Sequence, residues 1–305
     1  MYGRLFCFGL GYTALALARD LQAEGWRIAG TTRSPDKQAR LAAEGFEVHL
    51  FDRDRPLADP DAALAGATHL VSSIAPDDAG DPVLDHHEPD LRRCRTLGWA
   101  GYLGTTGVYG DRGGAWVSEG DPLAPSLPRT QRRVAAEGRW LASGLPVHVF
   151  RLAGIYGPGA GRNALETVRA GTARRIVKPG QMFGRVHVAD IVQVLRASMA
   201  RPNPGAIYNV ADDEPAPPQD VITFACSLLG VAPPPEIPFD EAELSPMARS
   251  FYLDNRRIRN ARIKEELGVR LCYPSYRQGL RAILDQEVVP PRPAASCGPR
   301  VFRTR

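Results

Sequence analysis

The first half of the chain alternates short apolar runs with segments of helical periodicity, and this alternation restricts the fold more than any other feature. The apolar runs predict strands at residues 4–8, 26–31, 46–51, 69–73, 101–105 and 146–153. Helical periodicity predicts helices at residues 12–23, 35–43 and 129–142. Strands and helices that alternate in this way build βαβ units and a parallel sheet with helices on both faces. The sequence therefore predicts an α/β fold.

After Gly157 the rhythm changes and the predicted elements are more varied. Helices are expected at residues 163–170, 189–200, 219–229, 255–267 and 275–284, and strands at residues 185–188 and 207–210. Residues 231–238 are rich in proline and are expected to form a loop. From residue 288 onward, repeated prolines without periodicity predict a loose basic tail.

Composition narrows the classes of function. The 305 residues include 44% hydrophobic and 24% charged residues, as in an ordinary globular protein. The net charge of +4 is not gathered into a dense stripe, which argues against nucleic acid as the main partner. No run of 18 apolar residues occurs, so no membrane span is expected. Five scattered cysteines without a CxxC pair favour a reducing compartment, and we expect a cytoplasmic protein.

A glycine pattern, G-x-G-x-x-A at residues 9–14, lies between the first predicted strand and the first predicted helix. Gly9 permits a sharp turn, Gly11 lets the backbone approach a diphosphate, and Ala14 lets the helix pack closely on the sheet. The diphosphate would then meet the free amides at the start of the helix, beginning with Tyr12. The pattern predicts a dinucleotide site, and the alternative is a structural tight turn.

The end of the second predicted strand indicates the type of dinucleotide. An NAD site usually has an acidic residue there, which binds the ribose 2′-hydroxyl. Residues 30–34 read Gly-Thr-Thr-Arg-Ser and contain no carboxylate. Arg33, with the hydroxyl of Thr32 beside it, is suited to a 2′-phosphate. We therefore predict that NADP(H) is preferred over NAD(H), although Arg33 could instead be a solvated loop residue.

Several further segments resemble the short-chain dehydrogenase/reductase superfamily, in its extended and atypical NAD(P)-dependent epimerase/dehydratase branch. The resemblance covers roughly residues 4–284. The matching segments are GLGY at residues 9–12, GTTGVYG at 104–110, SEGDP at 118–122, RLAGIYGPG at 151–159, HVADI at 187–191 and YNVAD at 208–212. It implies a Rossmann-type doubly wound parallel sheet with a smaller C-terminal substrate domain.

This resemblance sets the expected domain boundaries. Residues 1–160 would form the dinucleotide-binding Rossmann domain, to which residues 184–212 return. Residues 161–287 would form most of the substrate domain, and residues 288–305 the tail. The family also has dimers built from helices that flank the sheet, so a homodimer is compatible with the resemblance.

The resemblance also implies roles for individual residues. Asp52, after the third strand, would contact the adenine. The residues that would lie beside the nicotinamide ribose are Ser72, Ser73, Ile74 and Ala75. Thr105 occupies the position of the catalytic serine or threonine of the family. The alternative for Thr105 is a hydrogen bond at the end of a strand.

The chain departs from the family at its catalytic Tyr-x-x-x-Lys pair. Alignment places Arg129 where the tyrosine belongs and Arg133 where the lysine belongs. Arg133 still offers positive charge, but a guanidinium stays protonated and cannot relay a proton. A missing general acid or base typically costs about 10²–10⁴-fold in rate. Tyr109, Tyr156 and His187 are the candidate substitutes, each with a structural role as the alternative.

Two functions remain open after this departure. We favour an NADP-preferring oxidoreductase or epimerase-like enzyme that acts on a small polar or sugar-like substrate. Thr105 would then hydrogen-bond the reacting oxygen. The alternative is a non-catalytic NADP-binding module that senses the cofactor or supports a partner.

Two further patterns are given structural interpretations. Residues 85–88, Asp-His-His-Glu, lack metal-site spacing and are interpreted as a polar stretch leading into a helix around Leu91, so no metal is expected. Residues 256–262 are the densest basic run and are interpreted as the solvated face of a helix, with contact to an anionic substrate as the alternative.

Overall fold

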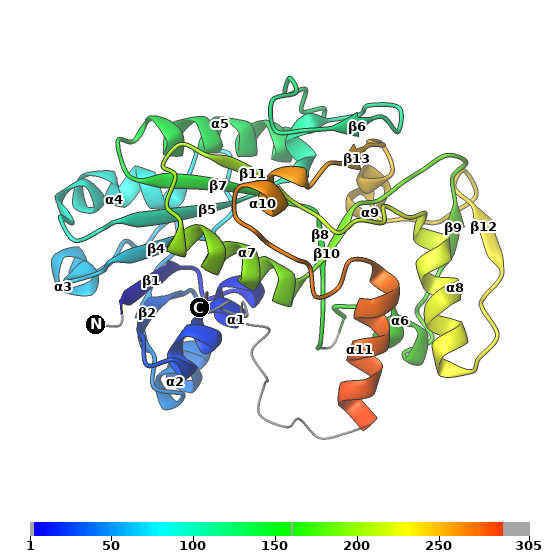
Figure 1. The fold of residues 1–305 in the computed structure, drawn as a ribbon, viewed down its shortest axis with the longest axis horizontal. Helices are drawn as coiled ribbons and strands as arrows, with labels where there is room; N and C mark the ends of the chain where they lie inside the picture. Colours follow the sequence, from blue (N-terminus) through cyan, green and yellow to red (C-terminus); the bar gives the residue numbers. More distant parts are fainter. Residues whose placement is uncertain (1–2, 160, 289–305) are drawn as a thin grey trace, which may run out of the picture.

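A seven-stranded parallel sheet forms the centre of the computed structural model, which describes residues 3–159 and 161–288 (Figure 1). The strand order is β11-β7-β5-β4-β1-β2-β3. The strands are β1 (Arg4–Phe8), β2 (Arg27–Thr32), β3 (Glu47–Leu50), β4 (His69–Ser72), β5 (Trp99–Thr105), β7 (Val147–Leu152) and β11 (Ile207–Val210). The order runs outward from β1 in both directions, so the predicted doubly wound α/β fold is confirmed.

Helices cover both faces of this sheet, as Figure 1 shows. One layer contains α1 (Tyr12–Ala23), α2 (Pro35–Ala43) and α7 (Val188–Ala200), and the other contains α3 (Pro60–Leu64), α4 (Pro82–Arg93) and α5 (Pro128–Ala142). Strand β1 packs into both layers because its side chains alternate between the faces. Leu5 and Cys7 belong to the core under α1 and α7, whereas Phe6 and Phe8 belong to the core under α3, α4 and α5.

A smaller part of the molecule lies at one end of the sheet. Its elements are β8 (Gly154–Tyr156), α6 (Ala164–Arg169), β9 (Arg175–Val177), β10 (Arg185–His187), α8 (Pro218–Leu229), β12 (Glu236–Pro238) and α11 (Tyr276–Val288). Two parallel pairs, β8 with β10 and β9 with β12, accompany a separate small apolar core around Leu165, Val221 and Leu280. The exact domain boundaries stay a prediction.

Three local predictions are wrong. The expected helix at residues 255–267 is a strand, β13 (Arg257–Ile258), followed by a short helix, α10 (Ala261–Glu265). Strand β13 pairs with β6 (Trp116–Val117), so the basic run is not the face of one helix. Ile258 and Ile263 share one core, and their spacing imitated helical periodicity. Residues 236–238 form β12 inside the expected loop, and residues 85–88 lie within α4.

The described residues also exclude one class of element. None of their helices combines the length and the apolar character needed to cross a bilayer. The basic tail predicted for residues 288–305 lies, after its first residue, outside the described residues.

Candidate functional site

The glycine loop lies at the carboxyl edge of the sheet, between β1 and α1 (Figure 1). Thr31 of β2 fixes it from the neighbouring strand. Its Oγ1 accepts a hydrogen bond from the Gly9 amide at 2.8 Å, and its carbonyl accepts one from the Leu10 amide at 2.8 Å. Because β1 is where the strand order reverses, this loop borders the crevice in which doubly wound sheets bind ligands.

The two glycines of the loop serve different needs. Gly9 has a φ of 86°, and a Cβ there would lie 2.9 Å from Ile74 Cγ1, so the fold itself requires glycine. Gly11 has an ordinary φ of −78°, and a Cβ there would contact only Ser73 Oγ, at 3.9 Å. Neither backbone strain nor crowding within the described protein requires glycine at position 11. An added Cβ would instead fill the space over the start of α1, so the residues fit a ligand placed there.

The start of α1 is open to an anion. Within the described residues, Gly11 provides no side-chain cap, and the first turn of α1 contains no acidic residue. The first intrahelical bond to the loop runs from the Leu15 amide to the Gly11 carbonyl at 2.8 Å. The preceding amides, beginning at Tyr12, therefore lie at the positive end of the helix dipole without an intrahelical acceptor. Ala14 is fully buried, as the close packing of the helix on the sheet requires.

The end of β2 presents cations and no carboxylate. Thr32 is buried, and Arg33 follows it with an exposed side chain. Lys37, in the first turn of α2, reaches back and donates from Nζ to the Leu10 carbonyl at 2.6 Å. Burial, with Arg40 and Arg19 nearby, lowers the pKa of Lys37. Sequence reasoning missed Lys37, although a lysine in the helix after this strand was a readable signal.

Asp52 follows β3 and is tied to a second cation that the sequence reasoning missed. Its Oδ2 accepts from Arg55 Nη2 at 2.6 Å, and its Oδ1 accepts from the Asp54 amide at 3.2 Å. Arg55 also donates to the Arg33 carbonyl at 3.0 Å. The loops after β2 and β3 are therefore joined through Arg55, whose charge is paired with Asp52. Contact between Asp52 and an adenine stays a prediction.

The residues expected beside the nicotinamide ribose lie at the end of β4. Ser72 is fully buried, and its Oγ has no hydrogen-bond partner within the described residues. Ser73 donates from Oγ to the Gly9 carbonyl at 2.5 Å, so this segment contacts the glycine loop directly. Ile74 is half-buried and Ala75 is exposed. Their contact with a cofactor stays a prediction.

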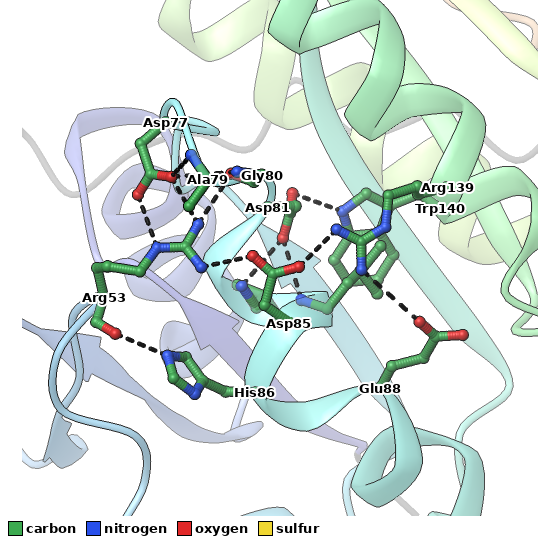
Figure 2. A network of polar contacts seen from close by, with 12 residues as sticks. Arg53, Asp77, Ala79, Gly80, Asp81, Asp85, His86, Glu88, Arg139 and Trp140 are labelled. Atoms are coloured by element: carbon green, nitrogen blue, oxygen red, sulfur yellow. Dashed lines mark hydrogen bonds and ion pairs between the residues drawn. The ribbon is translucent and has the colours of Figure 1, made fainter.

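A network of ion pairs and hydrogen bonds holds residues 77–80, which follow the end of β4, as Figure 2 shows. Arg53 binds both carboxylate oxygens of Asp77, at 2.8 and 2.7 Å, and donates to the Gly80 carbonyl at 3.0 Å. Asp85 of α4 accepts from Arg53 at 2.5 Å and from Arg139 of α5 at 2.5 Å. The Arg53 guanidinium lowers the pKa of Asp77. This network fixes the edge of the site against α4 and α5.

Thr105 lies at the end of β5 and is half-buried. Its Oγ1 accepts from the Gly107 amide at 3.1 Å, which caps the 3-10 helix η1 (Thr106–Tyr109). This is the strand-end bond considered as its alternative role. The hydroxyl proton is not used in that bond, so Thr105 can still donate to a substrate oxygen. Its catalytic role stays a prediction.

The two arginines at the positions of the catalytic pair have other partners. Arg129 donates to Ser250 Oγ and, at 3.7 Å, to Met247 Sδ. Its guanidinium also lies 4.7 Å from the ring centre of Phe251, so it anchors α9 (Pro246–Phe251). Arg133 donates to the Leu103 carbonyl of β5 at 3.1 Å. Both side chains therefore make structural contacts.

Tyr109 is fully buried. Its hydroxyl donates to Asn209 Oδ1 at 2.7 Å and accepts from Arg151 Nη1 at 2.8 Å. Arg151 in turn pairs with the buried Glu137 at 2.5 Å. Burial raises the pKa of Tyr109, against the opposing effect of Arg151. Through these contacts Tyr109 connects η1 to β7 and β11. A role of Tyr109 in proton transfer stays a prediction.

Tyr156 and His187 are also buried and lie against each other, with ring centres 5.2 Å apart. The Tyr156 hydroxyl donates to the Ser275 carbonyl at 3.3 Å, and burial strongly raises its pKa. Burial lowers the pKa of His187 to about 4, so its ring is neutral at pH 7 and cannot serve there as a general acid.

The sequence Asp-His-His-Glu in α4 has other partners as well. Asp85 binds Arg53 and Arg139, and His87 Nδ1 lies 2.7 Å from Asp90 Oδ2. Across residues 3–159 and 161–288, no group of three or more His, Cys, Asp or Glu side chains is placed to hold a metal ion.

Comparisons with known proteins bear on this site. No family model matches the chain. A functionally unknown conserved protein from Silicibacter pomeroyi DSS is 55% identical, with a TM-score of 0.87 over 93% of this chain and 99% of that one. A protein described as an NAD-dependent epimerase/dehydratase from Methylobacillus flagellatus is 25% identical, with a TM-score of 0.69 over 94% and 99%.

Two further proteins share sequence or fold with this chain. Protein YeeZ from Escherichia coli K12 is 27% identical over 249 residues, which cover 74% of this chain and 84% of that protein. The human epimerase family protein SDR39U1, solved with NADPH, is 16% identical, with a TM-score of 0.70 over 92% of this chain and 99% of that one. At that identity the likeness concerns the fold alone.

Proposed function

Because the chain belongs to the short-chain dehydrogenase/reductase superfamily, in its extended and atypical NAD(P)-dependent epimerase/dehydratase branch, we propose that it binds NADP(H) along the carboxyl edge of its sheet. One observation carries this proposal. Gly11 has an ordinary φ and open space around it, yet it is a glycine, directly before the uncapped start of α1. A ligand backbone or diphosphate lying over this position explains why a side chain is absent.

The preference for NADP(H) over NAD(H) rests on charge at the end of β2. Arg33 and Thr32 would hold the 2′-phosphate, with Lys37 as an additional cation nearby. A carboxylate, which would bind a 2′-hydroxyl and repel a phosphate, is absent from residues 30–34. Solved structures of this fold hold NADPH, as in SDR39U1, or NAD, as in MoeE5, so they agree with a nicotinamide cofactor, and the preference rests on the residues of this chain.

The activity that we favour is an oxidoreductase or epimerase-like reaction on a small polar or sugar-like substrate. When bound, the nicotinamide supplies hydride transfer. Thr105 would orient the reacting oxygen by donating its hydroxyl proton. The network around Arg53 would keep the β4 edge of the site rigid. MoeE5, a protein of this fold solved in complex with UDP-glucose and NAD, agrees with a sugar-like substrate.

One observation favours a second candidate, a non-catalytic NADP-binding module. The two arginines at the Tyr-x-x-x-Lys positions bind α9 and the β5 backbone. Neither could relay a proton in any case. A chain that keeps the dinucleotide site but uses these two positions for structural contacts would sense the cofactor or support a partner.

A binding measurement tests the proposed cofactor site. Gly11→Val should weaken NADPH binding by at least about tenfold, because the side chain fills the diphosphate position and at least one charge-assisted bond is lost. The matched control is Gly138→Val at an exposed position of α5, where a Cβ meets nothing within 4 Å. Wild-type protein that does not bind NADPH, or equal binding by Gly11→Val, would refute the site.

A turnover assay separates the two candidate functions. Aldehydes, ketones and nucleotide sugars that raise the unfolding temperature in the presence of NADPH would be followed at the nicotinamide absorbance. The enzyme hypothesis requires a change in absorbance with at least one of them, and loss of that rate in Thr105→Val. Tight NADPH binding without turnover across the panel would favour the non-catalytic module.

A further inference from the structure

The smaller part of the molecule reaches back to the start of α1. The Tyr12 hydroxyl, in the first turn of α1, donates to the Pro158 carbonyl at 2.9 Å. Gly157 is so close to this contact that a Cβ there would lie 2.4 Å from the Tyr12 hydroxyl oxygen and 2.7 Å from Val188 Cγ1. The segment after β8 is therefore packed directly against the residue that begins the proposed diphosphate site.

The same segment brings a cation to that place. The guanidinium carbon of Arg162 lies 4.6 Å from the centre of the Tyr12 ring. Two backbone hydrogen bonds hold Arg162 in position. The Arg162 amide donates to the Gly159 carbonyl at 3.1 Å, and the Arg162 carbonyl accepts from the Gly157 amide at 3.3 Å. Its side chain is exposed, and within the described residues its guanidinium has no hydrogen-bond or carboxylate partner. Arg162 is thus a positioned cation whose charge is not neutralised there.

The surroundings of Arg162 are positive. It lines a cavity of about 340 Å³ together with Arg174 and Arg185, and no acidic side chain is among the described residues that line this cavity. The Tyr12 ring on which Arg162 stacks belongs to the first residue of α1, at the positive end of the helix dipole. An anion bound at the first turn of α1 and within reach of Arg162 would be stabilised by the helix dipole and by the guanidinium.

We propose that Arg162 binds the diphosphate of the dinucleotide and so completes, from the smaller part of the molecule, a site that the glycine loop begins. This inference rests on the proposed function. A helix terminus offers about half an elementary charge, whereas a diphosphate has two negative charges. Arg162 supplies a full charge and several N–H donors, and its stacking on Tyr12 leaves the edge of the guanidinium free to donate. Cofactor binding would then join the two parts of the chain.

The test compares two arginine variants with two dinucleotides. Arg162→Ala should weaken NADPH and NADH by the same factor, about tenfold, because both contain the diphosphate. Arg33→Ala should weaken NADPH alone, because only NADPH carries the 2′-phosphate. Binding of 2′-AMP, which lacks the diphosphate, should not change in Arg162→Ala. Arg259→Ala is the matched control, since Arg259 is also exposed and stacks on an aromatic ring, Trp116, at 5.5 Å.

The outcomes separate this inference from the proposed function. If wild-type protein binds no dinucleotide, the proposed function fails. If Gly11→Val loses NADPH binding while Arg162→Ala keeps it unchanged, the dinucleotide site stands and the role of Arg162 is overturned. Equal loss of 2′-AMP and NADPH in Arg162→Ala would show that the residue acts through the fold, which also overturns it. An unfolding temperature of ligand-free Arg162→Ala equal to that of the wild type is expected.

Discussion

At the scale of single residues, the chain distinguishes positions required by its own fold from positions that make sense only with a ligand. Gly9 needs glycine because of its positive φ and its close neighbours, whereas Gly11 needs it for neither reason. The same distinction applies to arginines. Arg151 has a buried carboxylate partner in Glu137. Arg33, in contrast, is exposed and directly follows β2, where residues 30–34 contain no carboxylate. The cofactor proposal rests on Gly11 and Arg33, the two positions that the fold itself does not explain.

Replacement of Arg33 tests the cofactor preference. Arg33→Ala should raise the dissociation constant of NADPH by about tenfold or more and leave that of NADH unchanged, because a charge-assisted bond to the 2′-phosphate is lost. Titration calorimetry with both dinucleotides measures this. Arg40→Ala, which removes an exposed arginine in the last turn of α2, should change neither constant. Equal preference in wild type and Arg33→Ala would contradict the prediction.

Tyr109 gives a prediction about stability. Tyr109→Phe should lower the free energy of unfolding by about 1–3 kcal/mol, because Asn209 and the buried Arg151 lose a hydrogen-bond partner. Denaturant unfolding measures this loss, while NADPH binding and any turnover should stay unchanged. If turnover disappeared in Tyr109→Phe without a change in stability, Tyr109 would be the proton relay and its structural role would be secondary.

At the scale of elements, the sequence predicted the strands and helices of the sheet well and the short elements poorly. Strand β1 and helix α2 occur at the predicted residues because an apolar run and helical periodicity are local signals. The short helix α9 has no buried residues and was not predicted, because its position depends on contacts with Arg129. Strand β13 was mistaken for a helix because its pairing with β6 joins residues about 140 apart in the chain.

The network at the end of β4 predicts how stability depends on pH. The Arg53 guanidinium holds the pKa of Asp77 below its ordinary value of 3.8. A carboxyl with a lowered folded-state pKa stabilises the fold above its unfolded pKa and loses that contribution as the pH falls through the folded pKa. The free energy of unfolding should therefore fall from about pH 4 downward.

A pair of variants tests the contribution of Arg53, which pairs with both Asp77 and Asp85. In Arg53→Met the decrease between about pH 7 and about pH 3 should be smaller than in the wild type, as measured by urea unfolding. Arg92→Met, which removes an exposed pair with Glu88 on α4, should keep the wild-type slope. An identical acid limb in Arg53→Met and wild type would show that Asp77 is not stabilised by Arg53.

At the scale of the whole molecule, the carboxyl edge of the sheet provides the proposed dinucleotide site, and the smaller part of the molecule contacts this edge. The sequence predicted the glycine loop and the cation at the end of β2, since each depends on residues adjacent in the chain. It did not predict that Arg162 stacks on Tyr12, because nothing local relates residues 150 positions apart. The side chains that face a substrate depend on the same long-range packing. Substrate identity therefore could not be derived from the order of residues.

The central claim is that a dinucleotide diphosphate lies over the start of α1. Hydrogen–deuterium exchange with and without saturating NADPH tests this location directly. The account predicts slower exchange of the amides in residues 9–14 when NADPH is bound, with unchanged exchange around the exposed Gly138 of α5. Binding of NADPH that left the exchange of residues 9–14 unchanged would contradict the account.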